Sequence, residues 1–225
     1  MSDGLGCAAD DYSEKYLRDN YFGYRIWMYR PYIRAIARRA RIPKRGRVLD
    51  AGCGQGFFSS LFGRLGFQTL GVDTSAEGIQ SAIANFGSAL VSFQVGDILS
   101  MNAPRIYDCV FCRSCSLYNT ENIENSRETT DALLGMVKPG GVLVFDYYTK
   151  LSPRKASSSW IYHSLAVVRR HFNRYPRSRV YFTLRIDTLF FGRLSFTLPL
   201  YWLSRVISTT TGIGGDIVAL VWKTE

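Results

Sequence analysis

The chain has 225 residues, of which 47% are hydrophobic, and a formal net charge of +10 at pH 7. This length predicts one domain with a sizeable core, and the composition excludes a disordered or a membrane-spanning chain. The polar, acidic N-terminus lacks the apolar run of a secretory signal, so we expect a cytoplasmic location and reduced thiols at the five cysteines.

Charge is distributed unevenly along the chain. Residues 1–47 carry 11 Lys/Arg and 5 Asp/Glu, residues 48–150 carry 6 and 10, and residues 151–225 carry 11 and 3. A mildly acidic middle between basic flanks favours an anionic substrate or a negatively charged surface as the partner. Arginines that only keep the surface soluble explain the same counts equally well.

The segment before the first expected strand is aromatic and then basic. Residues 12–30 hold seven aromatic side chains, and Pro31 fits the first turn of a helix. Helical spacing places an apolar face and a parallel basic stripe on that helix. These two faces are Ile33, Ile36, Ala37 and Ala40, and Arg34, Arg38, Arg41 and Arg45.

Residues 48–62 organise the expected fold and read V-L-D-A-G-C-G-Q-G-F-F-S-S-L-F. A short buried strand carries Asp50, three glycines then allow a tight turn, and a helix begins at Phe57. A strand that passes through glycines into a helix N-terminus presents backbone amides to a ligand. The dinucleotide fingerprint G-x-G-x-x-G would need glycine in place of Phe57, and Asp50 would repel a pyrophosphate. The run therefore suits a cationic ligand.

This run resembles motif I of the class I S-adenosylmethionine (SAM)-dependent methyltransferases, whose cofactor carries an ammonium and a sulfonium. Four later stretches resemble further motifs of that family in order: Gly71–Ser75, Val95–Ile98, Tyr107–Asn119 and Val137–Gly141. The resemblance implies an α/β, Rossmann-like fold. Its seven-stranded, mostly parallel sheet would have helices on both faces and an antiparallel C-terminal strand. The resemblance also implies SAM as the cofactor and S-adenosylhomocysteine as the product.

The expected cofactor residues lie at the ends of neighbouring strands. Asp73 would accept hydrogen bonds from the ribose hydroxyls, because a capping box from Thr74 to Glu77 leaves its carboxylate free. Asp97 would reach the adenine amino group while Ile98 packs on the ring; an aspartate that only caps its own loop is the alternative. The full expected set is Asp50, Gly52, Gly54, Gly56, Asp73, Thr74, Asp97, Ile98 and Arg113.

Three cysteines of the fourth strand and the loop after it, Cys109, Cys112 and Cys115, have the spacing C-x-x-C-x-x-C. Residues 109 and 112 of a strand face opposite ways, so we expect packing rather than a shared metal. No acid ends that strand, so the magnesium site of catechol-type relatives is not expected. The [DNS]-P-P-[FY] motif and the Pro-Cys dipeptide of nucleic-acid enzymes are also absent.

Acceptor residues are expected beyond the carboxyl ends of the strands, where open parallel sheets bind their substrates. These residues are Ser114, Tyr118 and Asn119 after the fourth strand, and Tyr148 at the end of the fifth. The family resemblance also implies an N-terminal lid that brings Tyr21 or Tyr24 near the cofactor. Helices that merely pack on the sheet are the alternative reading of that segment.

The C-terminal part is expected to complete the sheet and to supply a base. A turn at Pro139–Gly141 leads into a strand over 142–148, and a helix follows from Trp160 to about Phe172. A hydroxyl or protonated amine acceptor needs a base. The candidates, in order, are His163, Asp146 and His171; histidines that only pack in the core are the alternative.

Strands near 196–201 and 217–223 are expected to close the sheet as an antiparallel hairpin. Residues 189–207 are apolar but interrupted by arginines and a proline, so they cannot span a bilayer. They could touch a membrane surface or an acyl chain, or simply form core and pocket wall.

One domain is therefore predicted over 1–225. Its parts are a helical lid (1–46), a cofactor core (47–150), an inserted substrate cap (151–182) and the rest of the sheet (183–225). The predicted function is methyl transfer from SAM to a small or lipid-linked, anionic acceptor, with a sugar or natural-product hydroxyl favoured. An RNA or protein methyltransferase that uses the basic flanks, and a non-catalytic SAM-binding partner subunit, are the alternatives.

Overall fold

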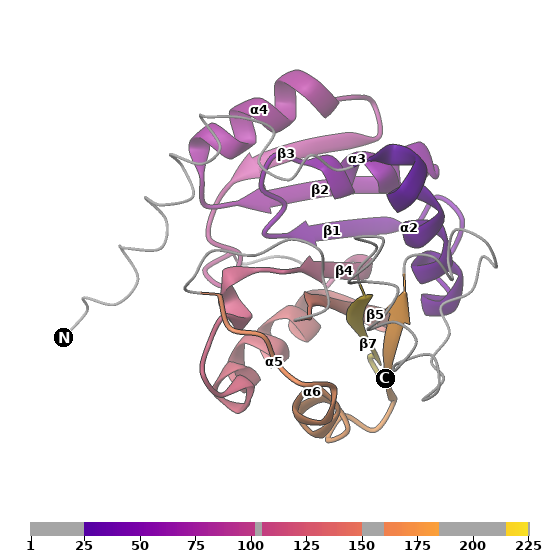
Figure 1. The fold of residues 1–225 in the computed structure, drawn as a ribbon. Coiled ribbons are helices and arrows are strands. Elements are labelled where there is room, and N and C mark those ends of the chain that lie inside the picture. Colours follow the sequence, from indigo (N-terminus) through magenta and orange to yellow (C-terminus); the bar gives the residue numbers. More distant parts are fainter. Residues whose placement is uncertain (1–24, 102–104, 150–159, 185–214, 225) are drawn as a thin grey trace.

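The computed structural model describes residues 25–101, 105–149, 160–184 and 215–224. Within them the strands form a seven-stranded sheet in the order β3-β2-β1-β4-β5-β7-β6 (Figure 1). The strands are β1 (Arg47–Ala51), β2 (Gln68–Asp73), β3 (Val91–Val95), β4 (Tyr107–Arg113), β5 (Val137–Tyr148), β6 (Ser178–Leu184) and β7 (Gly215–Trp222). Strands β1 to β5 pair in parallel, whereas β7 is antiparallel to both β5 and β6. The predicted fold class is confirmed.

The register of the parallel strands brings their carboxyl ends to one edge of the sheet. Ala51 at the end of β1 pairs with Val72 on β2 and Cys112 on β4. At the same level Arg113 pairs with Asp146 on β5. The residues that follow β1, β2, β4 and β5 therefore meet along this carboxyl edge, where ligands of open α/β sheets bind.

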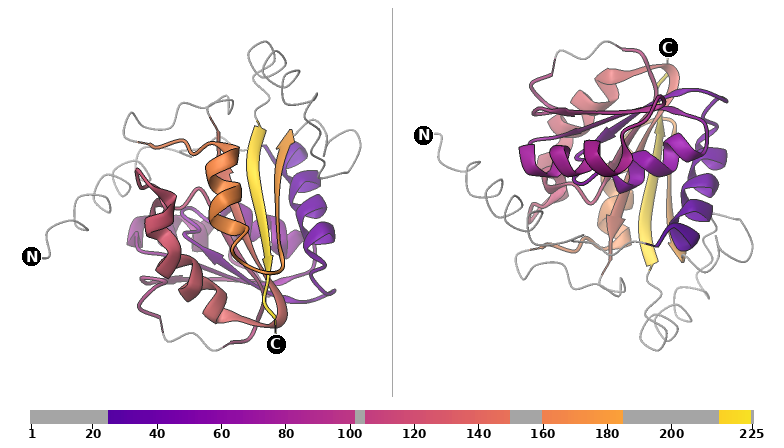
Figure 2. Two further views of the ribbon diagram at one scale, coloured as in Figure 1. Left: turned by 90° about the horizontal axis from the view of Figure 1, so that it is seen from below. Right: turned by 90° about the horizontal axis from the view of Figure 1, so that it is seen from above.

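Helices cover both faces of the sheet (Figure 2). On one face lie α2 (Ile26–Ala40) and α3 (Phe57–Arg64), with α4 (Ala76–Phe86) beside α3 against β2 and β3. On the other face lie α5 (Arg127–Met136) and α6 (Leu165–Phe172), which the 3-10 turns η1 (Ser116–Tyr118) and η2 (Ile123–Ser126) precede. The alternation of side chains along β1 feeds both cores: Val48 packs under α2 and α3, and Leu49 under α5 and α6.

The N-terminal helix starts earlier than its proline predicts. α2 begins at Ile26, so Pro31 lies inside the helix rather than in its first turn. The buried face extends upstream through Tyr29 and Tyr32, which are 4% and 0% exposed. Burial of two large rings offsets the one backbone hydrogen bond that a proline removes near a helix start.

Three other boundaries differ from the prediction. β5 starts at Val137 and runs through Pro139–Gly141, which were predicted as a turn, and the β4–β5 register shifts there. α6 starts only at Leu165, because Ser164 caps it by accepting a hydrogen bond from the Val167 amide at 3.3 Å. His163 therefore precedes the helix. The predicted helix over 122–137 divides into η2 and α5.

The predicted hairpin partner of the last strand is wrong. β7 has β5 on one side and β6 on the other, so it does not pair with residues 196–201, which lie outside the described residues. Residues 189–207 and the lid tyrosines Tyr21 and Tyr24 also lie outside them. The division into lid, core, cap and remaining sheet stays a prediction, as does the cytoplasmic location. Among the described helices, none has the length and apolarity needed to cross a bilayer.

Candidate functional site

The turn between β1 and α3 has a conformation that demands glycine. Gly52, Gly54 and Gly56 have φ values of 74°, 52° and 79°, which other residues rarely adopt. A Cβ on Gly52 would lie 2.7 Å from the Cys115 Sγ, and one on Gly56 would lie 2.6 Å from the Phe93 ring. The turn is therefore fixed both by its backbone and by the side chains packed against it.

The start of α3 leaves backbone donors available to a ligand. Its N-cap is Gly56, which has no side chain to accept their hydrogen bonds, and its first turn contains no acid. The first amides of a helix have no partner within the helix and carry a partial positive charge. A hydrogen-bond acceptor of a ligand can therefore bind here.

Asp50 adds a buried carboxylate beneath the turn. Its side chain is 2% exposed and accepts a 2.5 Å hydrogen bond from the Ser59 hydroxyl on α3. Burial raises the pKa of Asp50 to about 7, although the Ser59 hydrogen bond lowers it, and the Asp73 charge raises it further. A cation bound nearby would stabilise the ionised form, so this position suits a positively charged ligand.

Asp73 is not free, contrary to the prediction. Its carboxylate accepts hydrogen bonds from the amides of Gly54, at 2.8 Å, and Ser75, at 3.0 Å. The N-cap of α4 is Ser75, whose hydroxyl accepts the Gly78 amide at 3.0 Å, so the predicted capping box at Thr74 is displaced by one residue. Asp73, at the end of β2, thus holds the glycine turn in place. Its oxygens retain lone pairs that a ligand can use.

The residues after β3 follow the alternative reading in part. Asp97 is exposed and accepts hydrogen bonds from the Leu99 amide at 3.0 Å and the Ser100 hydroxyl at 2.7 Å, so it caps its own loop. Ile98 is buried in the core cluster that also contains Val72. The predicted adenine contacts of Asp97 and Ile98 stay predictions.

Arg113 and Asp146 form a buried ion pair that the sequence did not reveal. The Arg113 guanidinium pairs with Asp146 and also lies 3.3 Å from the Asp216 carboxylate on β7. Burial lowers the pKa of Arg113, but the two carboxylates outweigh it and raise the pKa overall. Four aromatic rings surround the guanidinium at 4.7–5.8 Å, those of Phe58, Tyr148, Tyr29 and Tyr32.

Arg113 and Asp146 are thus engaged with one another, although the Arg113 Nε has no hydrogen-bond partner among the described residues. The cofactor role predicted for Arg113 and the base role predicted for Asp146 stay predictions. Burial raises the pKa of Asp146 to about 6, and Arg113 opposes that rise. The predicted acceptor residue Tyr148 lies against the same guanidinium, with its ring centroid 5.0 Å away. Together these residues join the ends of β4, β5 and β7 under α2.

Tyr118, predicted as an acceptor residue, and His171, predicted as a candidate base, are both core residues. Tyr118 is fully buried, and its hydroxyl lies 3.0 Å from the Thr130 hydroxyl on α5, so the side chain belongs to the core rather than to the acceptor site. His171 is also fully buried, with Nε2 3.0 Å from the same Thr130 hydroxyl and a pKa that burial lowers. Both side chains lie between α5, α6 and the sheet, as core residues do.

His163 is also buried, at 6% exposed, but it lies at the carboxyl edge beside η1. Its Nε2 is 2.9 Å from the Tyr118 carbonyl oxygen. A carbonyl can only accept, so Nε2 carries the hydrogen and Nδ1 is the ring nitrogen that can take up a proton. The imidazole packs on the Tyr147 ring at 5.3 Å.

The same edge holds the remaining predicted acceptor residues. Asn119 accepts the Ile161 amide at 2.8 Å, which fixes the segment that carries His163. Ser114 has φ 43°, and its hydroxyl is buried without a hydrogen-bond partner in the described part of the chain. Unpaired buried hydroxyls are costly and are common at functional sites.

Sequence reasoning missed three residues of this region. Ser59 was recognisable as a polar residue on the apolar face of α3, but its partner Asp50 was not. Tyr147 donates a hydrogen bond to the Ile161 carbonyl at 3.1 Å, and Trp160 stacks on its ring at 5.4 Å. Only the fold could bring these rings to the carboxyl edge, because they come from different elements.

The cysteines of the fourth strand and its loop are free thiols. Cys109 and Cys112 are buried in the two different cores, on opposite faces of β4. Burial is the largest cause that raises the pKa of Cys109. The described residues contain no cluster of three or more His, Cys, Asp or Glu that could hold a metal ion.

Comparison with known proteins agrees with this geometry. A family model described as a methyltransferase domain matches residues 24–181. A ubiquinone biosynthesis O-methyltransferase of Xanthomonas campestris is 30% identical over 112 residues, which is 48% of this chain and 45% of that protein. The chain thus matches about half the length of such curated relatives.

Solved structures share the fold over the whole chain. A complex between the Haloferax volcanii Trm112 methyltransferase activator and a methyltransferase gives a TM-score of 0.66 at 18% identity, covering 95% of this chain and 98% of that one. The magnesium protoporphyrin IX methyltransferase of Synechocystis PCC 6803, solved with bound SAM, gives 0.63 at 14% identity and covers 100% of both chains. The family match spans well over half of the sequence, and the chain therefore belongs to the methyltransferase-domain family that its glycine turn resembles.

Proposed function

We propose that this chain binds SAM at the carboxyl edge and transfers its methyl group to a small or lipid-linked, anionic acceptor. The observation that carries the proposal is the glycine turn between β1 and α3. Its Gly54 amide is held at 2.8 Å by Asp73, and the α3 amides behind it have no side-chain cap. The family match and the SAM-bound structural relatives give the cofactor its chemical identity.

The residues of the turn fit a cationic adenosyl cofactor. Gly52, Gly54 and Gly56 place no side chain of their own over the backbone of the turn. The buried Asp50 carboxylate gains a cationic partner when the cofactor's ammonium and sulfonium lie near it. Asp73 would bind the ribose hydroxyls with lone pairs that its two backbone hydrogen bonds leave over. Asp97 and Ile98 would lie near the adenine.

The cofactor supplies a methyl group on a sulfonium, which needs in-line alignment and exclusion of water more than acid–base chemistry. This chain would provide that alignment through Ser114 and Asn119 at the carboxyl edge. His163 would accept the proton of a hydroxyl acceptor at Nδ1, since its Nε2 is held by the Tyr118 carbonyl. The O-methyltransferase name of the curated relatives favours oxygen as the acceptor atom.

Two other functions remain as alternatives. An RNA or protein methyltransferase would use the basic residues of both flanks. A partner subunit without its own catalysis is the second, and the Haloferax volcanii complex is one example of a methyltransferase that assembles with another chain. The conformation of the glycine turn and the presence of His163 at the edge favour an active enzyme.

The experiment is methyl transfer from SAM labelled on the methyl group, offered to separate pools of small metabolites, extracted lipids, RNA and protein. We expect label in the metabolite or lipid pool. Gly54→Val, which obstructs the turn, should abolish the transfer, whereas the control Gly135→Ala, where a Cβ meets no atom within 4 Å, should leave it unchanged. Label in RNA or protein alone would contradict the proposed acceptor, and label in no pool would favour the partner subunit.

A further inference from the structure

The outer face of α2 is a dense cationic surface. Residues 25–47 contain nine Lys/Arg and no Asp/Glu. Arg30, Arg34, Arg38 and Arg41 follow one another at spacings of three or four residues and are all exposed. We call this row, together with Arg25, the arginine face.

The arginine face favours the helix dipole only in the last turn of α2, at Arg38. Like charges at this spacing weaken a helix, and Arg25 occupies the N-cap, where the helix dipole disfavours a cation. Ion pairs within the described residues form at Arg113, Arg127, Lys138 and Arg174, but none forms at the arginine face. An exposed row of like charges that forms no ion pair with any described residue is suited to an external anionic partner.

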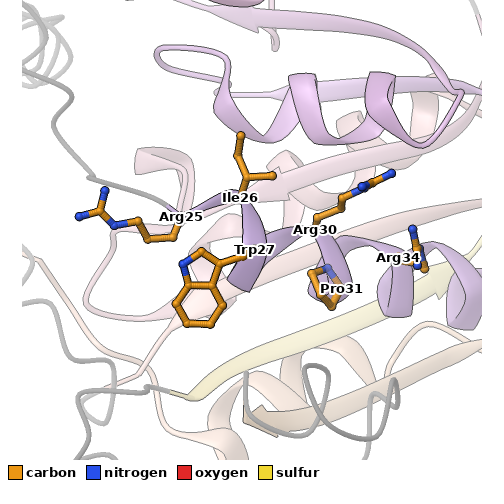
Figure 3. A pocket seen from close by; sticks show the side chains of 6 residues that line it. All are labelled: Arg25, Ile26, Trp27, Arg30, Pro31 and Arg34. Carbon is orange, nitrogen blue, oxygen red and sulfur yellow. The ribbon is translucent and has the colours of Figure 1, made fainter.

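Two hollows lie along this face and share Arg30 and Arg34. The first has a volume of about 680 Å³ and is lined by Arg25, Ile26, Trp27, Arg30, Pro31 and Arg34 (Figure 3). The second, of about 430 Å³, adds Arg38 and Arg64 to a floor that includes Ile42, Leu65 and Phe67. Each hollow thus combines guanidinium groups with apolar walls, an environment suited to phosphate groups attached to an apolar body.

The end of α2 nearest the candidate site is exposed and apolar. Trp27 is 59% exposed and Ile26 is 42% exposed. One turn further on, Tyr29 packs on Phe57 and Phe58 at the start of α3, so this end lies at the carboxyl edge. The other end lies at the opposite edge, where the Ala40 carbonyl accepts a hydrogen bond from the Trp222 indole.

We infer that the arginine face docks this protein on an anionic phospholipid surface, with Trp27 and Ile26 inserted at the level of the headgroups. Arginines with tryptophan and isoleucine beside them are the composition of an interfacial helix. Docking in this orientation would hold the carboxyl edge close to the lipid, where a lipid-linked acceptor resides. The docking itself does not depend on methyl transfer.

A nucleic acid fits the same face less well. Single strands bind where aromatic rings alternate with cations along the groove and stack on successive bases. Here the second hollow has one aromatic ring, Phe67, among its arginines and aliphatic residues, and that ring is buried. The exposed side chains of Trp27 and Ile26 gather at one end of the arginine row. Lipid insertion buries both Trp27 and Ile26, whereas base stacking would use only the first.

The test is flotation of the full chain with vesicles of mixed phosphatidylglycerol and phosphatidylcholine, and with vesicles of phosphatidylcholine alone. We expect binding to the anionic vesicles only, weakening as salt rises. Arg34→Ala with Arg38→Ala should weaken binding roughly thirty-fold, at the strength expected for two basic residues near an anionic bilayer. The matched control is Arg170→Ala with Arg177→Ala, which removes the same charge from exposed positions beyond the arginine face and should change binding little.

Brominated lipids give an independent readout of depth. They should quench the fluorescence of the wild-type chain, and Trp27→Phe should remove most of that quenching although three other tryptophans remain. The inference would be overturned if both double variants lost vesicle binding equally. It would also be overturned if the wild-type chain bound phosphatidylcholine vesicles as strongly as the anionic vesicles. Weakened binding of single-stranded oligouridine in Arg34→Ala/Arg38→Ala with vesicle binding unchanged would overturn it as well. Calorimetry of S-adenosylhomocysteine on the same variants separates this result from the cofactor proposal, since cofactor binding should be unaffected.

Discussion

Asp50 offers the sharpest test of the site electrostatics. In the folded chain its pKa is about 7, against an ordinary value of 3.8, chiefly because its carboxylate is buried. Well below pH 4 the carboxyl is neutral in both the folded and the unfolded state, so its burial does not lower the free energy of unfolding. As pH rises toward 7 the unfolded chain releases this proton first, so stability is lost between pH 4 and about 7.

Asp50→Asn removes that cost and keeps the carbonyl oxygen that accepts the Ser59 hydroxyl. A pKa that rises from 3.8 to about 7 corresponds to about 4 kcal/mol of native-state free energy at about 1.4 kcal/mol per pKa unit. At pH 8 the variant should therefore unfold at a higher urea concentration than the wild type. Near pH 4 the two proteins should unfold at the same urea concentration. In thermal melts at pH 8 the gain should be roughly 10 °C for a chain of this size.

The assay is urea unfolding of both proteins across that pH range, without cofactor. A difference that stays constant with pH, or a variant less stable than the wild type at pH 8, would refute the assigned burial of the charge. The same substitution should weaken SAM binding, because the carboxylate that destabilises the empty site would attract the cationic cofactor. Stability and cofactor affinity are therefore expected to change in opposite directions.

The remaining predictions concern the turn, the buried ion pair and the histidines. Gly56→Ala should lower the free energy of unfolding by about 2–4 kcal/mol in urea titrations, because a Cβ there is both strained and blocked by a ring on β3; a loss near zero would refute the constraint. Arg113→Met should cost about 3–5 kcal/mol by leaving buried carboxylates unpaired, and adding Asp146→Asn should recover part of it; no recovery would contradict the pairing. At saturating cofactor His163→Gln should lower turnover roughly a hundred-fold while His171→Gln leaves it unchanged; equal effects would remove His163 as the base.

The sequence was most informative where chain geometry alone determines the structure. Positive φ values at the glycines between β1 and α3 follow from the G-x-G-x-G run, and the apolar run of β5 predicts a strand buried on both faces. The mostly parallel sheet was implied by the family resemblance of the motifs. Local pattern and tertiary fold agree in these segments, so the prediction needed no knowledge of distant contacts.

The sequence was less informative where a residue's role depends on a partner far away in the chain. Arg113 meets Asp216, 103 positions later, and His171 meets Thr130, 41 positions earlier. No spacing rule links such pairs, so four polar residues expected at the site, Arg113, Tyr118, Asp146 and His171, proved to be buried with internal partners. Pro31 is a local example, since ring burial on the sheet overrides its helix-starting preference.

The most direct test of the whole account is isothermal calorimetry with S-adenosylhomocysteine, with NADH as the comparison ligand. The account predicts saturable heat with S-adenosylhomocysteine, loss of that heat in Gly54→Val, and none with NADH, since Phe57 stands where a dinucleotide fold needs glycine. Saturable uptake of NADH, with no heat from the adenosyl compound, would contradict the assignment of the carboxyl edge to a cationic methyl donor.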